Sequence, residues 1–131
     1  MKQLLKLTGC LAVAGLFVSC QSVQQEANYQ VIPLPQEIVV EQGIPFILKS
    51  GVKILYPEGN EKMQRNAKFL ADYLKTATGE DFTIEAGTEG KNVIILALGT
   101  ENENPEAYQL KVAGDGVTIT GSTEAGVFYG I

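Results

Sequence analysis

The side chains in this sequence that could carry chemistry are carboxylates, tyrosines and lysines, because the 131 residues contain no histidine. A His-containing triad or a His-ligated zinc site is therefore impossible within this chain. Glu80-Asp81 is the one pair of neighbouring carboxylates that invites an acid–base interpretation. It follows Gly79 in a predicted turn, where no apolar pocket would separate the two pKa values, so we interpret it as a solvated turn. We assign no catalytic, cofactor-binding or metal-binding residue, and we expect no cofactor.

The charge of the chain is strongly acidic beyond its first residues. The formal net charge is −5, but two of the ten basic residues, Lys2 and Lys6, lie in the first 19 residues, and all fifteen acidic residues lie after them. The remainder carries eight basic against fifteen acidic residues, a balance of −7. This balance argues against a nucleic-acid partner and against a polybasic attachment to anionic lipid.

The N-terminus has the parts of a secretory signal. A cationic end precedes an apolar run from Leu7 to Val18, which is shorter than the ~20 residues that span a bilayer. The run ends in Phe17-Val18-Ser19-Cys20, which resembles the lipobox of bacterial lipoproteins, although Phe17 stands where Leu is usual. We predict a signal peptide over residues 1–19 and lipidation of Cys20. A plain signal peptide or an uncleaved anchor is the alternative.

A flexible tether is expected after the lipid anchor. Residues 20–28 are polar, with little to bury, and would connect the membrane to a folded domain over 29–131. Cys10 would leave with the signal peptide, so no native disulfide is expected. Gln21 and Ser22 lack the Asp that favours retention in the inner membrane. We therefore expect a location in the cell envelope, lipid-anchored at the outer membrane.

Residues 29–131 are predicted to form short strands around one long helix. Asn60 is a plausible N-cap, Gly79 can close the helix in the left-handed conformation, and an apolar stripe lies between them. The stripe comprises Met63, Ala67, Leu70, Leu74 and Ala77. We interpret it as a packing face.

The strand predictions follow from apolar runs and turn residues. The continuous run Val93–Leu98 predicts a central strand buried on both faces, and Gly114–Gly116 predicts a hairpin. Further strands or extended segments are expected at 29–32, 38–41, 46–48, 52–56, 82–85, 107–112 and 117–121. Together these elements predict a mixed α/β (α+β) layer fold, with a mostly antiparallel sheet and the main helix packed on one face.

A second helix is predicted to start near the last residues. Ser122 or Thr123 would cap it, Glu124 lies in its first turn, and the rest is densely apolar up to Ile131. Two turns are fewer than the ~12 to 15 residues at which an isolated helix is marginally stable. We expect that the chain is truncated here. The alternative is a short terminal helix docked on the sheet.

Three segments carry a family resemblance: Val31–Gln36, the strand pair Tyr108–Val112 and Val117–Gly121, and Glu124–Ile131. In their order and separation they resemble the N-terminal non-catalytic domain of family 20 glycoside hydrolases, the β-N-acetylhexosaminidases. The similarity spans residues 29 to 131. Leading domains of family 84 enzymes and of α-glucuronidases are the neighbouring alternatives, and the segment from Ile32 to Gln36 favours family 20.

The resemblance implies hydrolysis of terminal β-linked N-acetylhexosamine residues from glycans with retention, by a substrate-assisted route that departs from the usual two-carboxylate scheme. It also implies a C-terminal (β/α)8 catalytic domain that holds the adjacent Asp and Glu of the reaction. That domain is absent from this sequence, and Glu80-Asp81 reverses the family order. The chain itself is therefore expected to be inactive.

Two other functions stay open. One is a stand-alone lipid-anchored module that binds glycans, with Tyr29, Tyr56, Tyr73 and Tyr108 as stacking surfaces; the other is a structural or interaction lipoprotein. Aromatic residues are only 8% of the chain and Trp is lacking, which weakens the glycan-binding reading. A sugar platform requires two coplanar exposed rings, whereas a support domain requires an uncovered apolar patch.

Overall fold

The computed structural model describes residues 29, 31, 34–99 and 102–131. The predicted signal peptide, Cys20 and the tether 20–28 lie outside the described residues. The chain divides into two compact units, residues 1–39 and 40–131. In the first unit the described residues form no helix or strand. The second unit contains, in chain order, β1 (Lys53–Tyr56), α1 (Glu61–Thr78), β2 (Thr83–Ala86), β3 (Val93–Leu98), β4 (Tyr108–Ala113), β5 (Gly116–Gly121) and α2 (Glu124–Tyr129).

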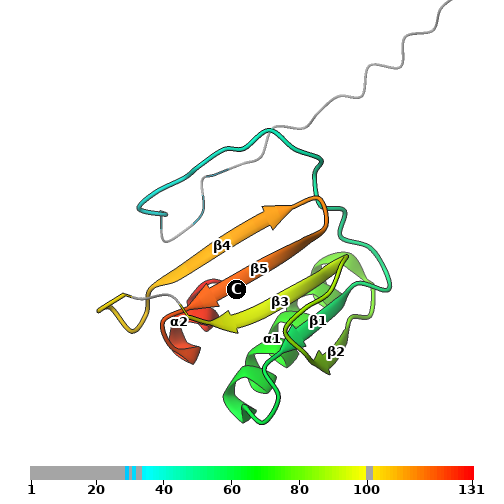
Figure 1. Ribbon diagram of the computed structural model, residues 1–131. Coiled ribbons are helices and arrows are strands. Elements are labelled where there is room, and N and C mark those ends of the chain that lie inside the picture. Colours follow the sequence, from blue (N-terminus) through cyan, green and yellow to red (C-terminus); the bar gives the residue numbers. More distant parts are fainter. Residues whose placement is uncertain (1–28, 30, 32–33, 100–101) are drawn as a thin grey trace, which may run out of the picture. The chain divides into compact units, whose positions relative to one another are not determined.

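The five strands form one sheet in the order β2-β1-β3-β5-β4 (Figure 1). The predicted mixed α/β fold class is confirmed, but the prediction that antiparallel pairing predominates is wrong. β1 pairs in parallel with β2 and with β3, and β3 pairs in parallel with β5. Only β4 and β5 are antiparallel, joined by the predicted turn at Gly114. Between β1 and β2, α1 returns the chain to the same end of the sheet, and such a crossover connects parallel strands.

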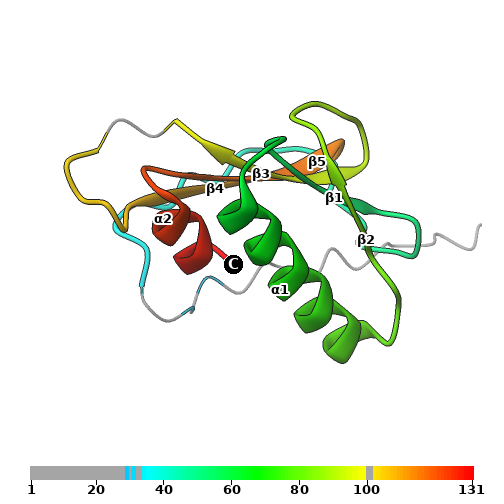
Figure 2. The ribbon, with the colours of Figure 1, turned by 90° about the horizontal axis from the view of Figure 1, so that it is seen from below.

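Both helices lie on the same face of the sheet (Figure 2). Helix α1 begins after Asn60, whose side chain accepts hydrogen bonds from the backbone N–H groups of Lys62 and Met63, and it closes at Gly79 with a φ of 78°. A non-glycine residue would be strained at that angle. The predicted packing face is confirmed at Met63, Ala67 and Leu70, which are buried, and Leu74 packs against the core. Ala77 is exposed, so the stripe leaves the sheet one turn before the helix ends.

Strand β3 lies in the middle of the sheet, as its continuous apolar run predicted. Ile94 and Leu96 are two residues apart and so share one face, and both belong to the core beneath the helices. Val93 is buried on the other face, while its neighbours Ile95 and Ala97 there are half-buried. The face that the helices cover is therefore buried at Ile94 and Leu96, whereas the opposite face is buried only at Val93.

Two of the predicted strands do not form. Residues 38–41 and 46–48 contain no strand in the structure. Pro45 has no N–H group to donate to a strand ladder, and the side chain of Ile44 is 80% exposed. An apolar alternation without a face to bury does not specify a strand. Phe46 is the exception within this segment, because it packs against the core.

Helix α2 confirms the predicted second helix and its cap. Thr123 Oγ1 accepts hydrogen bonds from the N–H groups of Ala125 and Gly126. Six residues are too few for an isolated helix, so packing must hold it. Val127 is fully buried in the core, and Gly126 lies so close to the Ala107 carbonyl that a Cβ there would collide with it. The glycines of the C-terminal segment thus allow close contact between α2 and the sheet.

Candidate functional site

The neighbouring carboxylates Glu80 and Asp81 lie between α1 and β2. Both are exposed, and Asp81 makes an ion pair with Lys75, with 2.5 Å between Asp81 Oδ1 and Lys75 Nζ. The Asp81 carboxylate raises the pKa of Lys75 by this hydrogen bond and by charge attraction. The Glu80 N–H donates to Thr78 Oγ1 at 3.2 Å. The interpretation of this pair as a solvated turn is confirmed.

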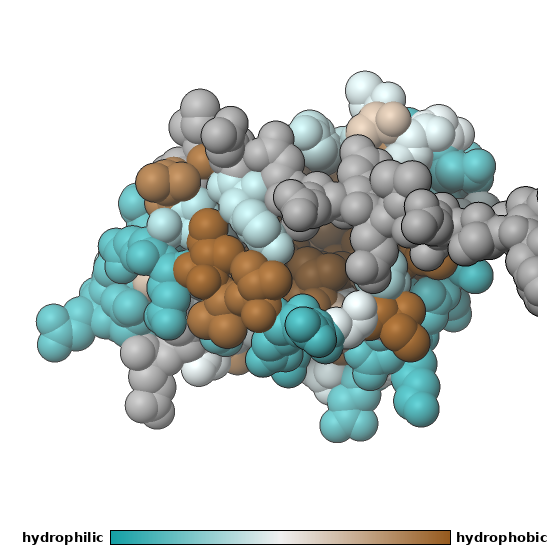
Figure 3. Space-filling view, turned by 90° about the horizontal axis from the view of Figure 1, so that it is seen from above, coloured by the Kyte–Doolittle hydropathy of each residue, from teal (hydrophilic) through white to brown (hydrophobic). Residues whose placement is uncertain are grey.

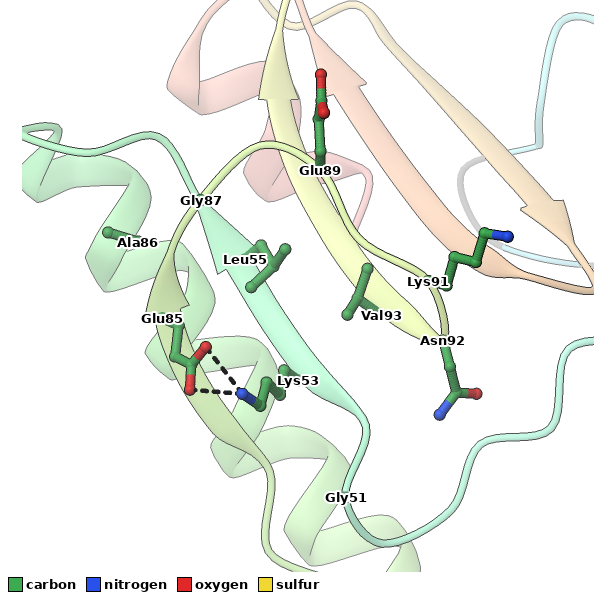
Figure 4. A pocket seen from close by; sticks show the side chains of 10 residues that line it. All are labelled: Gly51, Lys53, Leu55, Glu85, Ala86, Gly87, Glu89, Lys91, Asn92 and Val93. Atoms are coloured by element: carbon green, nitrogen blue, oxygen red, sulfur yellow. Dashed lines mark hydrogen bonds and ion pairs between the residues drawn. The ribbon is translucent and has the colours of Figure 1, made fainter.

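A shallow hollow lies on the sheet face opposite the helices, next to the ends of β1, β2 and β3 (Figure 4). Lys53 and Glu85 turn toward each other across β1 and β2, with 2.9 Å between Nζ and Oε1, while Glu89 and Lys91 point away from this pair. Leu55 lies among these side chains. The two charges of the ion pair are each nearly half exposed, and the hollow balances two cations against two anions. It concentrates neither charge nor aromatic surface for a ligand.

The described part of the chain offers neither a metal site nor a membrane span. Within residues 29, 31, 34–99 and 102–131, no three His, Cys, Asp or Glu residues are grouped so that they could hold a metal ion. Over the same residues, neither helix has the length and apolar character needed to cross a bilayer.

The most distinctive surface lies where α1 and α2 meet. Three rings gather there, and we refer to Phe69, Phe128 and Tyr129 as the aromatic cluster. The ring centroids of Phe69 and Phe128 are 5.2 Å apart, and those of Phe128 and Tyr129 are 6.0 Å apart. Each of the three residues is between 45% and 49% exposed. Lys62, Arg65 and Glu124 line a hollow next to Phe128 and Tyr129, which gives the cluster a charged border.

The two helices that carry this cluster are tied together by Glu124. Asn60 Nδ2 donates to Glu124 Oε1 at 3.1 Å, and Asn66 Nδ2 donates to the Glu124 carbonyl at 2.8 Å. A hydrogen bond from its own backbone N–H, followed by the one from Asn60, lowers the pKa of Glu124 below its usual value of 4.5. Thr123 Oγ1 also donates to the Pro105 carbonyl at 2.6 Å. These hydrogen bonds therefore hold α1 and α2, which carry the aromatic cluster, in a fixed relative position.

The tyrosines that the sequence offered for stacking do not form this surface. Tyr29 and Tyr73 are exposed, whereas Tyr56 packs against the core and the Tyr108 ring lies close to Gly130. Phe69 is not one of the residues of the apolar stripe, and Phe128 lies in the apolar segment at the end of the chain. Nothing in a single sequence indicates that residues 59 positions apart bring their rings together.

The geometry of the aromatic cluster bears directly on the glycan-binding alternative. The planes of Phe69 and Phe128 are inclined by 48°, and those of Phe128 and Tyr129 by 70°. These rings cannot offer one flat platform to a sugar. Most of the other exposed apolar side chains are aliphatic, Val40 and Ile47 among them, and Tyr29 and Tyr73 are the exposed rings outside the cluster. Apolar areas lie among polar ones in the view of Figure 3.

The family model and the similar solved structures point to the same family. Residues 28–131 match glycosyl hydrolase family 20, domain 2. Two solved structures are similar at 33% identity over 78% of this chain: the GH20 β-N-acetylhexosaminidase of Streptomyces coelicolor A3(2), with a TM-score of 0.65, and a mutant β-hexosaminidase of Streptomyces plicatus in complex with its product GlcNAc, with a TM-score of 0.68. The S. plicatus enzyme is also matched in complex with thio-NAglucal. No match was found among curated proteins.

This chain spans a fifth of the length of those solved hexosaminidases. The two exposed carboxylates and the aromatic cluster described above both lie within the matched residues. Because the match covers residues 28–131 of 131, the chain belongs to glycosyl hydrolase family 20, and this part of it is domain 2 of that family.

Proposed function

We propose that this chain is the non-catalytic N-terminal part of a β-N-acetylhexosaminidase that removes terminal β-linked N-acetylhexosamine residues from glycans. The observation that carries the proposal is the family 20 match over residues 28–131, together with 33% identity to two Streptomyces hexosaminidases. Those enzymes are about five times longer than the matched part, so the catalytic domain would be a further (β/α)8 domain.

The reaction would be carried out entirely by that further domain. In the substrate-assisted route, the 2-acetamido oxygen of the substrate attacks the anomeric carbon. An Asp orients the acetamido group, and the adjacent Glu protonates the leaving oxygen and later activates water. No residue of the present chain is given either role, because Glu80 and Asp81 lie in a solvated turn. The chain alone would be inactive.

The role that fits this chain is to support the catalytic domain. An uncovered apolar patch was the feature expected of a support domain, and the aromatic cluster supplies one. Its inclined rings weigh against the alternative of a stand-alone glycan-binding module.

Attachment to the membrane is a separate part of the proposal. The lipobox-like segment that ends in Cys20 supports cleavage after residue 19 and a lipid-modified N-terminus. Residues 20–28 would then connect the lipid to domain 2. We propose an envelope enzyme anchored at the outer membrane, and incorporation of labelled palmitate into the wild type but not into a Cys20→Ser variant would test the anchor.

The activity is tested with a chromogenic β-N-acetylglucosaminide. The product of the reading frame that includes any codons after Ile131 is assayed beside the 131-residue chain. Hydrolysis by the longer product alone is the expected result. A stop codon directly after Ile131, or a longer product without activity on either N-acetylglucosaminide or N-acetylgalactosaminide, would exclude the proposed function.

A further inference from the structure

We propose that residues 36–44 are a site of proteolytic release, at which one cut by an endoprotease frees the enzyme from its lipid anchor. The inference rests on the proposed function, because it requires both the anchor at Cys20 and a catalytic domain after domain 2. It adds a way of regulating where that enzyme works. The cut is a hydrolysis: water adds across one peptide bond, which breaks to give a new carboxylate and a new amino group.

The position of the segment is the first reason. Cys20 lies on its N-terminal side, and all the helices and strands of the described residues lie on its C-terminal side. The boundary between the two compact units falls inside the segment, between Val39 and Val40. Boundaries between compact units lie where few contacts cross. A cut in the segment therefore separates the anchor from domain 2 without removing a helix or a strand.

The second reason is that the segment is open to a protease. All nine residues are exposed, Val39 by 71% and Val40 by 68%. Within the described part of the chain, none of the nine makes a backbone hydrogen bond. A peptide that is bound as an extended strand uses these backbone groups, and its alternate side chains enter pockets. The segment is therefore ready for an endoprotease that accepts aliphatic side chains, and no local unfolding has to come first.

The third reason is that the chain is held immediately after the segment. Phe46 packs against the core, and none of residues 36–44 belongs to the core cluster. The Ile44 carbonyl oxygen lies close to the turn between β4 and β5, because a Cβ at Gly114 would be 2.9 Å from it. A cut before Ile44 therefore removes no residue on which the packing of domain 2 depends.

The connection that precedes β4 is less open over its described residues. The side-chain oxygens of Asn102 and Asn104 accept hydrogen bonds from the N–H groups of Asn104 and Glu106. The Pro105 carbonyl accepts a hydrogen bond from the Thr123 hydroxyl. A protease would have to wait until these bonds open, and cutting then follows the population of the open state. Glutamates in this connection therefore serve as internal controls.

A glutamyl endopeptidase tests the proposal, because Glu37 and Glu41 lie inside the segment. The full-length lipidated enzyme carries Glu26→Gln, so that no glutamate of the mature chain precedes Glu37. It is bound to vesicles of phosphatidylethanolamine and phosphatidylglycerol and treated with the protease. Cut positions are read by mass spectrometry, and hydrolase activity is measured in the vesicle pellet and in the supernatant. The control adds Glu37→Gln and Glu41→Gln and keeps Glu103 and Glu106.

We expect the first cut after Glu37 or Glu41, with activity released to the supernatant and kcat and KM unchanged. The control variant should be released about tenfold or more slowly. A first cut elsewhere, equally fast release of the control variant, or loss of activity on cutting within the segment would overturn the release site. Activity in the supernatant before protease is added would instead refute the anchor, and absence of activity throughout would refute the hydrolase; the release site would fall with either.

Discussion

The carboxamide of Asn60 joins two helices: its oxygen caps α1, and its nitrogen donates to the Glu124 carboxylate at the start of α2. One side chain therefore sets both where α1 begins and where α2 lies against it. Since Phe69 stands on α1 and Phe128 on α2, the contact between their rings depends on this link.

Replacement of Asn60 by Ala should destabilise the domain. The variant loses the cap on the N–H groups of Lys62 and Met63 as well as the bond to Glu124. We expect the free energy of unfolding in urea to fall by about 1–2 kcal/mol. Asn60→Ser is the control, because its hydroxyl oxygen can still cap α1 while the amide that donates to Glu124 is lost. A fall as large as that of Asn60→Ala would show that the cap contributes nothing.

The link to Glu124 should also make stability depend on pH. The pKa of Glu124 is lower in the folded state than its usual value of 4.5, so its contribution is complete above that value and is lost as the pH falls through the folded pKa. Melting temperatures measured from pH 6 to pH 2.5 should therefore fall less steeply for Glu124→Gln than for the wild type. Identical slopes would contradict the assignment of the charged carboxylate to this bond.

Gly126 should tolerate no side chain. A Cβ at this position would collide with the carbonyl oxygen of Ala107, and backbone atoms cannot move aside as a flexible side chain can. We expect Gly126→Ala to lower the free energy of unfolding by about 1–3 kcal/mol, the usual range for overpacking. The control is Gly43→Ala, since nothing lies within 4 Å of a Cβ there. Equal effects of the two variants would show that α2 is not held this closely.

The centre of the core should be sensitive to truncation on β3. Leu96 is fully buried beneath the helices, whereas Leu110 on β4 is 51% exposed. Leu96→Ala should cost about 2–5 kcal/mol of unfolding free energy, and the same change at Leu110 should cost much less. A comparable loss at both positions, measured by urea denaturation, would mean that β4 is covered in solution.

Local sequence signals predicted where the helices and strands lie better than they predicted which strands pair and in which direction. Asn60 and Gly79 marked the ends of α1, and the run Val93–Leu98 marked the central strand, because caps and burial leave their pattern in neighbouring residues. The direction in which two strands pair leaves no such pattern in neighbouring residues. Val93 lies beside Lys53 of β1 and Gly116 of β5, and only the folded chain brings those positions together.

The same limit applies to the surface. The sequence predicted that Glu80 and Asp81 lie in water and that a support domain should expose an apolar patch. It could not locate that patch, because Phe69 and Phe128 are brought together by the packing of α2 on the sheet. Ile38–Glu41 shows the opposite failure: an apolar segment was predicted as a strand although no face is available to bury it.

The carboxylates in the turn after α1 should be dispensable for hydrolysis. Asp81 is exposed and is paired only with the exposed Lys75 in the described structure. In the full-length enzyme, Glu80→Gln combined with Asp81→Asn should leave kcat and KM for a chromogenic N-acetylglucosaminide unchanged within about twofold. A loss of a hundredfold or more in kcat, the scale of a missing general acid, would place the chemistry in this chain after all.

The central claim, that this domain supports a hexosaminidase catalytic domain, is tested most directly by the half-life of hydrolase activity on heating. The full-length enzyme is compared with a version that lacks residues 29–131, both assayed on the same chromogenic N-acetylglucosaminide. We predict that the shortened enzyme either loses activity several times faster or is not obtained in folded form, and that Phe128→Ser in the full-length enzyme shortens the half-life in the same direction. A shortened enzyme that is folded, fully active and as heat-resistant as the complete one would contradict the account.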